Sequence, residues 1–374
     1  MEEFNLDAFE SYAKIVVIGC GGGGSNAVNQ MVEEQMRGVT FWVCNTDAQA
    51  LATSKAEHRL ILGRDVTHGL GAGGNPEVGR AAAEASMDDL YEVIQGANMV
   101  FIAAGMGGGT GTGAAPVVAK VAKECGALTI AIVTRPFTFE GEKRRKNAVN
   151  GINELKKNVD AIIIVSNDKL MIMNGTRPIS EAFAESDHVL AQSVKTITDL
   201  IVVPGVINLD FADVKNTLQN KGIAVIGFGT GNGEKKANDA ASSALLSPLL
   251  EASIQGAHSI IANVTCGNNV SLDEVKDAID YVTSAAGNTP NIIFGVQENP
   301  ELNDQMLISI VATEFDKDFD PLAEPLSVVQ PVPQVNDKVE DDEDDTEDES
   351  ILPSFLSKSK NNSELEESDI FSKE

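Results

Sequence analysis

The stretch Gly105-Met106-Gly107-Gly108-Gly109-Thr110-Gly111-Thr112-Gly113 decides the fold. It follows an apolar run at residues 99–104 that is typical of a buried strand, and it precedes a predicted helix over residues 114–125 with Pro116 in its first turn. A glycine-rich turn between a strand and a helix exposes backbone N–H groups at the positive end of the helix dipole, which favours phosphate. A flexible linker would lack both flanking elements. The stretch therefore predicts a phosphate site in an α/β fold.

Two further glycine clusters follow predicted strands. Residues 13–19 predict the first strand, and Gly19-Cys20-Gly21-Gly22-Gly23-Gly24-Ser25-Asn26 then fits the G-x-G-x-x-G pattern, ahead of a helix over about residues 27–34. Residues 69–76 (Gly-Leu-Gly-Ala-Gly-Gly-Asn-Pro) open a predicted helix over residues 77–91, and a plain turn explains this cluster as well as a phosphate contact does. Three such loops at one edge of a parallel sheet suit a di- or triphosphate.

An NAD site is the main alternative. The strand predicted over residues 40–44 ends in Asn45-Thr46-Asp47, which places an acidic residue where a dinucleotide fold binds ribose. No Lys-Ser/Thr pair follows Gly24, so this is not a Walker A loop. A dinucleotide fold needs only one glycine-rich turn, and the chain offers no evident histidine for hydride transfer. Both points count against NAD.

Strands predicted over residues 127–134 and 161–165 flank a helix over about residues 146–158. Before that helix, the Glu140 carboxylate is suited to accept hydrogen bonds from ribose hydroxyls, and Arg144 is suited to offset phosphate charge or to stack on a base. An exposed ion pair four residues apart on a helix explains the same two residues without any ligand.

Residues 178–203 predict one long helix with an apolar stripe. Phe183 and Asp187 lie one turn apart near its start. A ring and a carboxylate at this spacing suit guanine, whose N1–H and N2 amine are both donors. Without other information, the pattern favours a core phenylalanine and an aspartate that interacts with the helix dipole.

Asp210 and Asp213 stand three residues apart at the start of the next predicted helix. They are either an N-cap with first-turn charge or a carboxylate pair that orients water, and the pattern alone favours the cap. A second, smaller α/β domain without glycine-rich phosphate turns follows. Its predicted strands cover residues 223–229, 259–266, 291–296 and 306–312, and its predicted helices cover residues 238–250 and 272–286.

Composition limits the function classes. The 374 residues include 28 basic and 56 acidic side chains, a net charge of −28; from Gln330 onward 15 acidic and 4 basic residues give −11, so the remainder carries −17. An acidic body is a poor nucleic-acid binder. The four cysteines and four histidines show no metal spacing, which predicts no side-chain metal site and suggests a reducing cytoplasm. No apolar run is long enough to insert into a membrane, and residues 1–12 lack a signal-peptide pattern.

The C-terminal stretch predicts disorder with one apolar island. Residues 337–349 are nearly all acidic and self-repelling, which is typical of a disordered spacer. The island runs from Ile351 to Leu356, and its position beyond a spacer is typical of a peptide that docks on a partner. An incidental apolar patch is the alternative.

Several motifs in order resemble the FtsZ family, the bacterial relatives of tubulin. They span about residues 13–313 and comprise G-M-G-G-G-T-G-T-G-A-A-P at residues 105–116, N-T-D-A-Q-A-L at 45–51, G-L-G-A-G-G-N-P-E-V-G-R at 69–80, T-R-P-F-T-F-E-G at 134–141, S-N-D-K-L at 166–170 and P-G-V-I-N-L-D-F-A-D-V-K at 204–215.

The resemblance implies a tubulin-like fold and a GTPase that polymerises head to tail with Mg²⁺ and hydrolyses GTP between subunits of a division-ring filament beneath the inner membrane. It implies a GTP-binding domain (13–178), a central helix (179–203) and a C-terminal α/β domain (204–316), flanked by an N-terminal extension (1–12), a linker (317–349), a peptide (350–358) that docks tethers and regulators, and a tail (359–374). The implied GTP-binding residues are Gly21, Gly22, Gly23, Gly24, Ser25, Asn26, Gly71, Ala72, Gly73, Gly107, Gly108, Gly109, Thr110, Gly111, Glu140, Arg144, Asn167, Phe183 and Asp187. The implied catalytic loop, which enters the next subunit's pocket, carries Asn208, Asp210 and Asp213.

Overall fold

The computed structural model describes residues 13–174, 178–247, 250, 253–287 and 289–315. The predicted N-terminal extension (1–12), acidic linker (317–349), docking peptide (350–358) and tail (359–374) lie outside the described residues. None of the helices within the described ranges has the length and apolar content that a bilayer-spanning segment needs.

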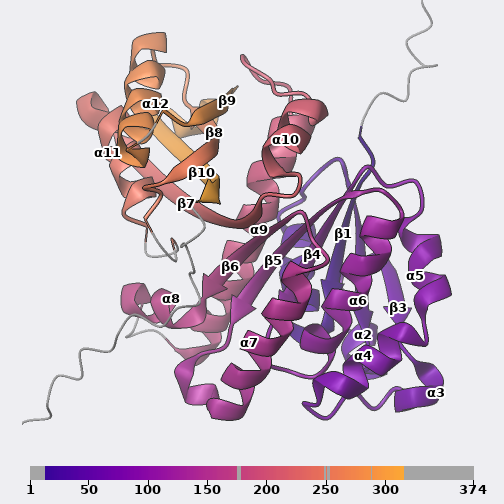
Figure 1. Ribbon diagram of the computed structural model, residues 1–374. Coiled ribbons are helices and arrows are strands. Elements are labelled where there is room, and N and C mark those ends of the chain that lie inside the picture. The colour runs from indigo at the N-terminus through magenta and orange to yellow at the C-terminus, as the bar shows by residue number, and fades with distance from the viewer. Residues whose placement is uncertain (1–12, 175–177, 248–249, 251–252, 288, 316–374) are drawn as a thin grey trace, which may run out of the picture. The chain divides into compact units, whose positions relative to one another are not determined.

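One ten-stranded sheet runs through the described residues (Figure 1). Its strands are β1 (Ile15–Cys20), β2 (Val39–Asn45), β3 (His58–Ile61), β4 (Met99–Gly105), β5 (Leu128–Arg135), β6 (Ala161–Ser166), β7 (Gly222–Asn232), β8 (Ala257–Cys266), β9 (Asn291–Glu298) and β10 (Gln305–Phe315). The spatial order is β3-β2-β1-β4-β5-β6-β7-β10-β8-β9. Strands β1 to β7 pair in parallel, whereas β10 is antiparallel to both β7 and β8.

The helices alternate with the strands. They are α1 (Gly21–Glu33), α2 (Ala48–Ala52), α3 (Arg64–Thr67), α4 (Pro76–Glu84), α5 (Met87–Ile94), α6 (Thr110–Glu124), α7 (Glu142–Lys156), α8 (Asn167–Asn174), α9 (Ile179–Val202), α10 (Phe211–Leu218), α11 (Lys236–Leu245) and α12 (Leu272–Ala286), with short 3₁₀ turns at Thr138–Glu140, Gly233–Lys235 and Pro300–Leu302. The expected α/β architecture, with a larger parallel part followed by a smaller part that contains antiparallel pairs, is confirmed.

Apolar side chains of alternating strand positions fill a core on each face of the first six strands. Val17 and Phe101 pack with residues of α1 and α9 on one face, while Ile18 and Ile102 pack with residues of α4, α5, α6 and α7 on the other. A third cluster joins β7 to β10 with α11 and α12. Because both faces are covered, the parallel strands are continuous apolar runs, as their sequences predicted. The two faces of the sheet are therefore covered by helices, and the ends of these strands remain available for a site.

The long helix predicted over residues 178–203 is confirmed as α9, with Pro178 as its N-cap. The expectation for Pro116 is wrong, because α6 begins at Thr110 and Pro116 lies inside the helix. The expected start of the first helix at residue 27 is also wrong, since α1 begins at Gly21. In both cases the helix extends back into the glycine-rich stretch. Gly21 to Gly24 form the first turn of α1, whereas Gly107 to Gly109 still precede α6 and only Gly111 and Gly113 lie within it.

The single helix predicted over residues 77–91 is in fact two, α4 and α5. Ser86 lies at the break, and its hydroxyl accepts a hydrogen bond from the Gly63 N–H at 3.0 Å. Serine favours such side-chain to backbone bonds over a helix interior. The strand β3 was not predicted; it pairs with β2 over four residues at the sheet edge.

Candidate functional site

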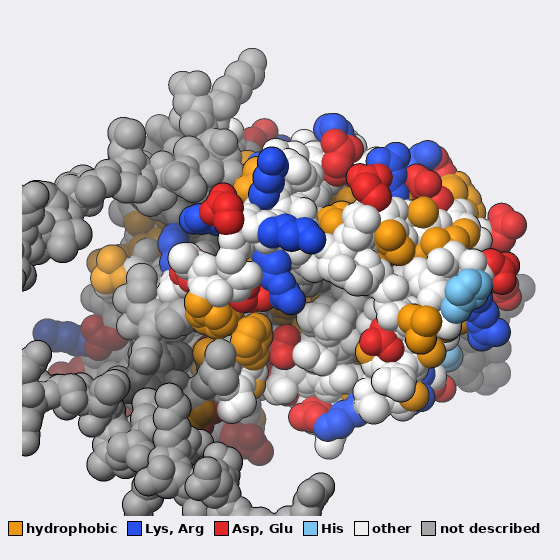
Figure 2. Space-filling view, turned by 90° about the horizontal axis from the view of Figure 1, so that it is seen from below, with side chains coloured by type: hydrophobic (Ala, Val, Ile, Leu, Met, Phe, Trp, Pro, Cys, Tyr) orange, Lys and Arg blue, Asp and Glu red, His pale blue; other side chains and the backbone are white. Residues whose placement is uncertain are grey.

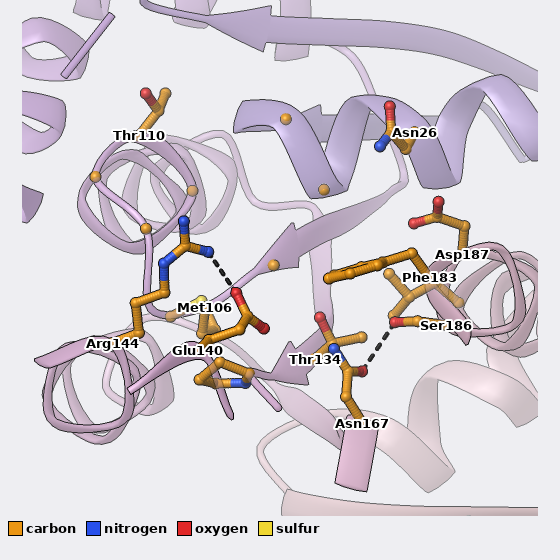
Figure 3. A pocket seen from close by; sticks show the side chains of 18 residues that line it. Asn26, Met106, Thr110, Thr134, Glu140, Arg144, Asn167, Phe183, Ser186 and Asp187 are labelled. Atoms are coloured by element: carbon orange, nitrogen blue, oxygen red, sulfur yellow. Dashed lines mark hydrogen bonds and ion pairs between the residues drawn. The ribbon is translucent and has the colours of Figure 1, made fainter. Parts of the chain in front are cut away.

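A cavity of about 400 Å³ opens at the carboxyl ends of the parallel strands (Figure 3). Its wall is formed by residues from the ends of β4 and β5 and from helices α1, α6, α7, α8 and α9. The lining residues are Gly22, Gly23, Asn26, Gly105, Met106, Gly108, Gly109, Thr110, Gly111, Thr134, Pro136, Glu140, Arg144, Asn167, Phe183, Ser186, Asp187 and Leu190. Side chains more than 160 positions apart in the chain thus face one space.

One end of the cavity is a backbone surface suited to phosphate. Gly22 and Gly23 come from the first turn of α1, and Gly108 to Gly111 from the start of α6. The first N–H groups of a helix have no partner within that helix, and the dipole adds positive charge there. A β-carbon built on Gly22 or on Gly108 would meet nothing within 4 Å, so the two glycines leave open space at the cavity. The adjacent Ser25 hydroxyl is buried without a hydrogen-bond partner among the described residues.

Other glycines of the first turn serve packing. A β-carbon on Gly24 would lie 2.2 Å from the Ala103 carbonyl oxygen, so only glycine lets α1 approach β4 this closely. A β-carbon on Gly21 would lie 2.7 Å from the Gly111 nitrogen, and Gly21 has a φ of +70°. Gly21, Gly24 and Ser25 are outside the lining. The close approach of Gly21 to Gly111 brings the starts of α1 and α6 together, and Gly24 packs α1 against β4. The cavity surface comes from neighbouring residues.

The glycine cluster at residues 69–76 packs against the start of α6 and does not itself face the cavity. The Gly71 N–H donates to the Thr46 carbonyl at 3.1 Å, and the Thr46 hydroxyl is 2.7 Å from that of Thr110 at the start of α6. A β-carbon on Gly109 would lie 2.8 Å from that of Ala72. Gly71, Ala72 and Gly73 do not line the cavity. Gly107 is likewise outside the lining, and its N–H donates to the Thr112 hydroxyl at 2.8 Å.

Glu140 and Arg144 form an ion pair at the side of the cavity (Figure 3). The i,i+4 pairing is therefore correct, but the expectation of an exposed pair on one helix is wrong, because Glu140 lies in the 3₁₀ turn before α7 and its side chain is only 12% exposed. Both side chains also line the cavity. A Glu140 carboxylate oxygen accepts from the Phe137 N–H at 3.0 Å. Asp168 accepts from the backbone N–H and the hydroxyl of Thr138, at 2.8 and 2.7 Å, and fixes the turn that carries Glu140.

Phe183 and Asp187 project from α9 at the opposite end (Figure 3). The expectation that Phe183 is a core residue is wrong, because it is 41% exposed and lines the cavity. Its ring packs edge-on against that of Phe137, with centroids 5.0 Å apart, and this contact holds the ring in place. Burial raises the pKa of Asp187 to about 7. A carboxylate that is desolvated without a charged partner is typical of a binding site.

Six lining residues are absent from the implied GTP-binding set, namely Gly105, Met106, Thr134, Pro136, Ser186 and Leu190, although the first two belong to the glycine-rich stretch that predicted a phosphate site. Gly105 is the last residue of β4 and Thr134 the last but one of β5. Their position at the carboxyl ends of predicted strands could have marked them as lining residues. Ser186 directly precedes Asp187 on α9. Nothing in its local sequence marks it, because its importance depends on a residue from another element.

The residues implied as catalytic lie outside the cavity lining. Asp210 is the N-cap of α10, where its carboxylate accepts from the Asp213 N–H at 2.8 Å, so the capping interpretation is confirmed. The Asn208 side-chain oxygen accepts from the Gly205 N–H at 2.6 Å. Asp47 is the N-cap of α2 and is also absent from the lining, which removes the acidic ribose ligand from the NAD alternative.

Comparison with known proteins identifies the fold family. Residues 14–175 match the Tubulin/FtsZ family GTPase domain, and residues 222–316 match the FtsZ family C-terminal domain. An empty FtsZ dimer from M. jannaschii is 41% identical with a TM-score of 0.78, over 82% of this chain and 90% of that one. This chain belongs to the FtsZ family.

Two further FtsZ-like structures are similar. A mutant form of M. jannaschii FtsZ is also 41% identical, with a TM-score of 0.78 over 81% of this chain and 92% of that one. CetZ2 from Haloferax volcanii, solved as a GTPγS-bound protofilament, shares the fold at 22% identity, with a TM-score of 0.69 over 81% of this chain and 94% of that one. This FtsZ-family chain therefore carries a GTPase domain whose activity is GTP hydrolysis.

Proposed function

We propose that GTP binds in this cavity, with its phosphates at the starts of α1 and α6 and its base at Phe183 and Asp187. The observation that carries the proposal is the polarity of the cavity: backbone N–H groups at one end, an aromatic ring and a desolvated carboxylate at the other. Glu140 lies between them, where a ribose would reach it. Gly22, Gly23, Asn26 and Gly108 to Gly111 form the phosphate surface, while the neighbouring glycines hold it in shape.

Asp187 gives a reason for guanine. An ionised carboxylate accepts from both the N1–H and the N2 amine of guanine, whereas adenine presents an acceptor at N1. Binding of two donors favours the charged carboxylate and so opposes the effect of burial on the Asp187 pKa. The Phe183 ring supplies a face on which a purine stacks.

Mg²⁺ suits this site only when it is bound to the nucleotide. Within the described residues no group of three or more His, Cys, Asp or Glu side chains is arranged to hold a metal ion. Mg²⁺ commonly retains several waters and binds substrate phosphates with few protein ligands. We therefore expect the ion to arrive on the β- and γ-phosphates and to offset their charge.

Hydrolysis, in this proposal, requires two subunits. The lining carries two carboxylates, Glu140 and Asp187, which we assign to ribose and base. Asp210 and Asp213 lie outside the cavity and are available to a neighbouring molecule. Head-to-tail stacking would bring them, with Asn208, to the γ-phosphate of the next subunit, where they orient the attacking water. The helix N-termini stabilise the charge that develops on the phosphate.

The test is the dependence of turnover on protein concentration. We expect phosphate release per subunit to rise above a threshold concentration at which light scattering with GTP also rises, and to stay low with GDP. A specific activity that is the same at all dilutions would contradict the shared site, although not GTP binding itself. Background phosphate release at every concentration would instead favour a filament that does not hydrolyse GTP.

We further propose that the filament forms a cell-division ring in the cytoplasm and that the segment from Ile351 to Leu356 docks membrane tethers and regulators. The support is the family and the apolar island beyond an acidic spacer. On the face in Figure 2, acidic and basic side chains are interspersed, consistent with partners other than nucleic acid. Deletion of residues 350–374 should leave GTP-dependent assembly intact and abolish capture of a membrane tether. Undiminished capture would place the docking site elsewhere.

A further inference from the structure

Asn167 and Ser186 meet in the wall of the cavity from two different elements (Figure 3). Asn167 is the first residue of α8, directly after β6, and Ser186 lies within α9. Each is only 4% exposed. The Ser186 hydroxyl donates to the Asn167 side-chain oxygen at 2.9 Å.

In the structure this hydrogen bond occupies the amide oxygen and leaves the amide nitrogen for a ligand. An asparagine amide carries one acceptor oxygen and one donor nitrogen, and a network around it decides how the two are placed. With the oxygen committed to Ser186, the Nδ2 group remains as the donor. Guanine presents acceptors at O6 and N7, whereas adenine presents an amine donor at the O6 position. A donor at this point therefore accepts guanine and rejects adenine.

We propose that Ser186 is a positioning residue for base recognition: it holds the Asn167 amide so that Nδ2 donates to the guanine O6. This inference rests on the proposed binding of GTP in the cavity. Asp187, the next residue on α9, accepts from the N1–H and N2 amine of guanine by direct contact. Ser186 acts on the acceptor O6 indirectly, through the Asn167 amide.

The alternative orientation of the amide shows why the hydroxyl matters. If Asn167 rotated by half a turn, its oxygen would face the O6 of guanine and two acceptors would oppose each other. A hydroxyl can pair with either end of the amide, and the pairing observed here is with the oxygen. Removal of the hydroxyl takes away the partner that anchors the amide in this arrangement. A buried polar group without its partner is costly, so the amide would populate both orientations or turn toward another donor.

Nucleotide analogues separate this role from a general effect on the pocket. The substitution Ser186→Ala removes the hydroxyl, and Ser186→Cys keeps a side chain of similar shape with a much weaker donor. The probes are GTP, ITP and 6-thio-GTP. ITP keeps O6 and lacks the N2 amine, whereas 6-thio-GTP keeps N1–H and the N2 amine but carries a poor acceptor at position 6. Affinities are measured by equilibrium titration at low protein concentration, where assembly does not contribute.

We expect S186A to weaken GTP and ITP by a similar factor of about 5 to 10, the usual range for one hydrogen bond. The affinity for 6-thio-GTP should change by less than about twofold, because the interaction that Ser186 supports is already impaired. S186C should behave as S186A. In an Asn167→Ala background, S186A should have no further effect, since the two residues act as one unit.

Two results would overturn the inference. Equal weakening of GTP and 6-thio-GTP by S186A would mean that Ser186 supports the pocket as a whole, and unchanged GTP affinity would mean that it supports nothing relevant to the base. Should S186A fail to fold, S186C supplies the same comparison. Failure of the unsubstituted protein to bind GTP would contradict the proposed function itself, and with it this inference, so the two failures are distinguishable.

Discussion

If GTP binds as proposed, we expect Asp187 to make GTP affinity depend on pH near neutrality. Burial raises the pKa of its carboxyl from the ordinary 3.8 to about 7. The protein without nucleotide is therefore about half protonated at Asp187 near pH 7. Guanine requires the ionised form, because its N1–H and N2 amine both need an acceptor. Nucleotide binding must consequently release a proton, and acidification must weaken it.

The magnitude follows from the fraction of protein that is ionised. For a pKa of about 7, roughly nine-tenths of Asp187 is ionised at about pH 8 and roughly one-tenth at about pH 6. The apparent dissociation constant for GTP should therefore increase about tenfold over this range, or about 1.4 kcal/mol. An aspartate with its ordinary pKa of 3.8 would give no change there.

The assay is equilibrium titration of a fluorescent GTP analogue at both pH values, below the assembly threshold. The phosphates of the nucleotide also titrate near pH 6, so the Asp187→Asn variant is the matched control that retains only their contribution. We expect D187N to bind more weakly at about pH 8 and to show a much smaller pH dependence. Equal pH dependence in the two proteins would refute the reasoning.

The same pKa shift has the opposite effect on stability. A raised pKa in the folded protein means that stability from this group is fully present below the unfolded-state pKa of 3.8 and is lost as pH rises through about 7. The nucleotide-free protein should thus be less stable at pH 8 than at pH 6 as far as Asp187 contributes. D187N should remove this loss and raise the unfolding temperature at pH 8, even though it binds GTP less well.

Other predictions concern the glycines at the start of α1, the carboxylate of Asp213 and the cysteine thiols. Gly22→Ala should fold normally and bind GTP weakly because its methyl enters open cavity space, whereas Gly24→Ala should be destabilised by about 1–3 kcal/mol through its contact with β4; chemical unfolding and GTP titration separate the two. Asp213→Ala should keep GTP affinity and lose turnover on the order of a hundredfold, and lost affinity would place Asp213 in its own subunit's pocket. A charged thiol reagent should modify Cys125 first, since the other three cysteines are buried. The pKa of Cys125 is raised by burial, and that of Cys20 by its hydrogen bond to Cys44 and by burial, so exposure makes the difference; rapid labelling of Cys20 would contradict this.

Local sequence was sufficient for every strand of the sheet except the short edge strand β3, but not for the exact ends of the helices. Continuous apolar runs identified β1, β4, β5 and β6, because strands buried on both faces have no polar alternation to disguise them. The beginnings of α1 and α6 were misplaced because glycine has low helix propensity, and here close packing against β4 and α4 overrides it. Such packing depends on residues distant in sequence.

The site shows the same limit. The glycine-rich stretches indicated phosphate directly, since backbone geometry is encoded locally. Phe183 was expected in the core because an aromatic residue on a helix is normally buried, and its place beside Phe137 could be seen only in the folded chain. Ser186 acquires its significance from Asn167, nineteen positions away on another element. A contact between two residues that are distant in the chain leaves no mark in the sequence around either of them.

The loop before α10 is already ordered by its own side chains, and this has a kinetic consequence. The Asp210 carboxylate caps the helix and accepts from the Asp213 N–H at 2.8 Å. The Asn208 side-chain oxygen accepts from the Gly205 N–H at 2.6 Å. The phosphate surface is equally built by packing of glycines against β4. If both halves of the site exist before assembly, contact between subunits alone completes it. Phosphate release should then begin together with light scattering after GTP is added, in proportion to polymer mass. A lag in phosphate release after scattering has reached its plateau would show that a slow rearrangement completes the site.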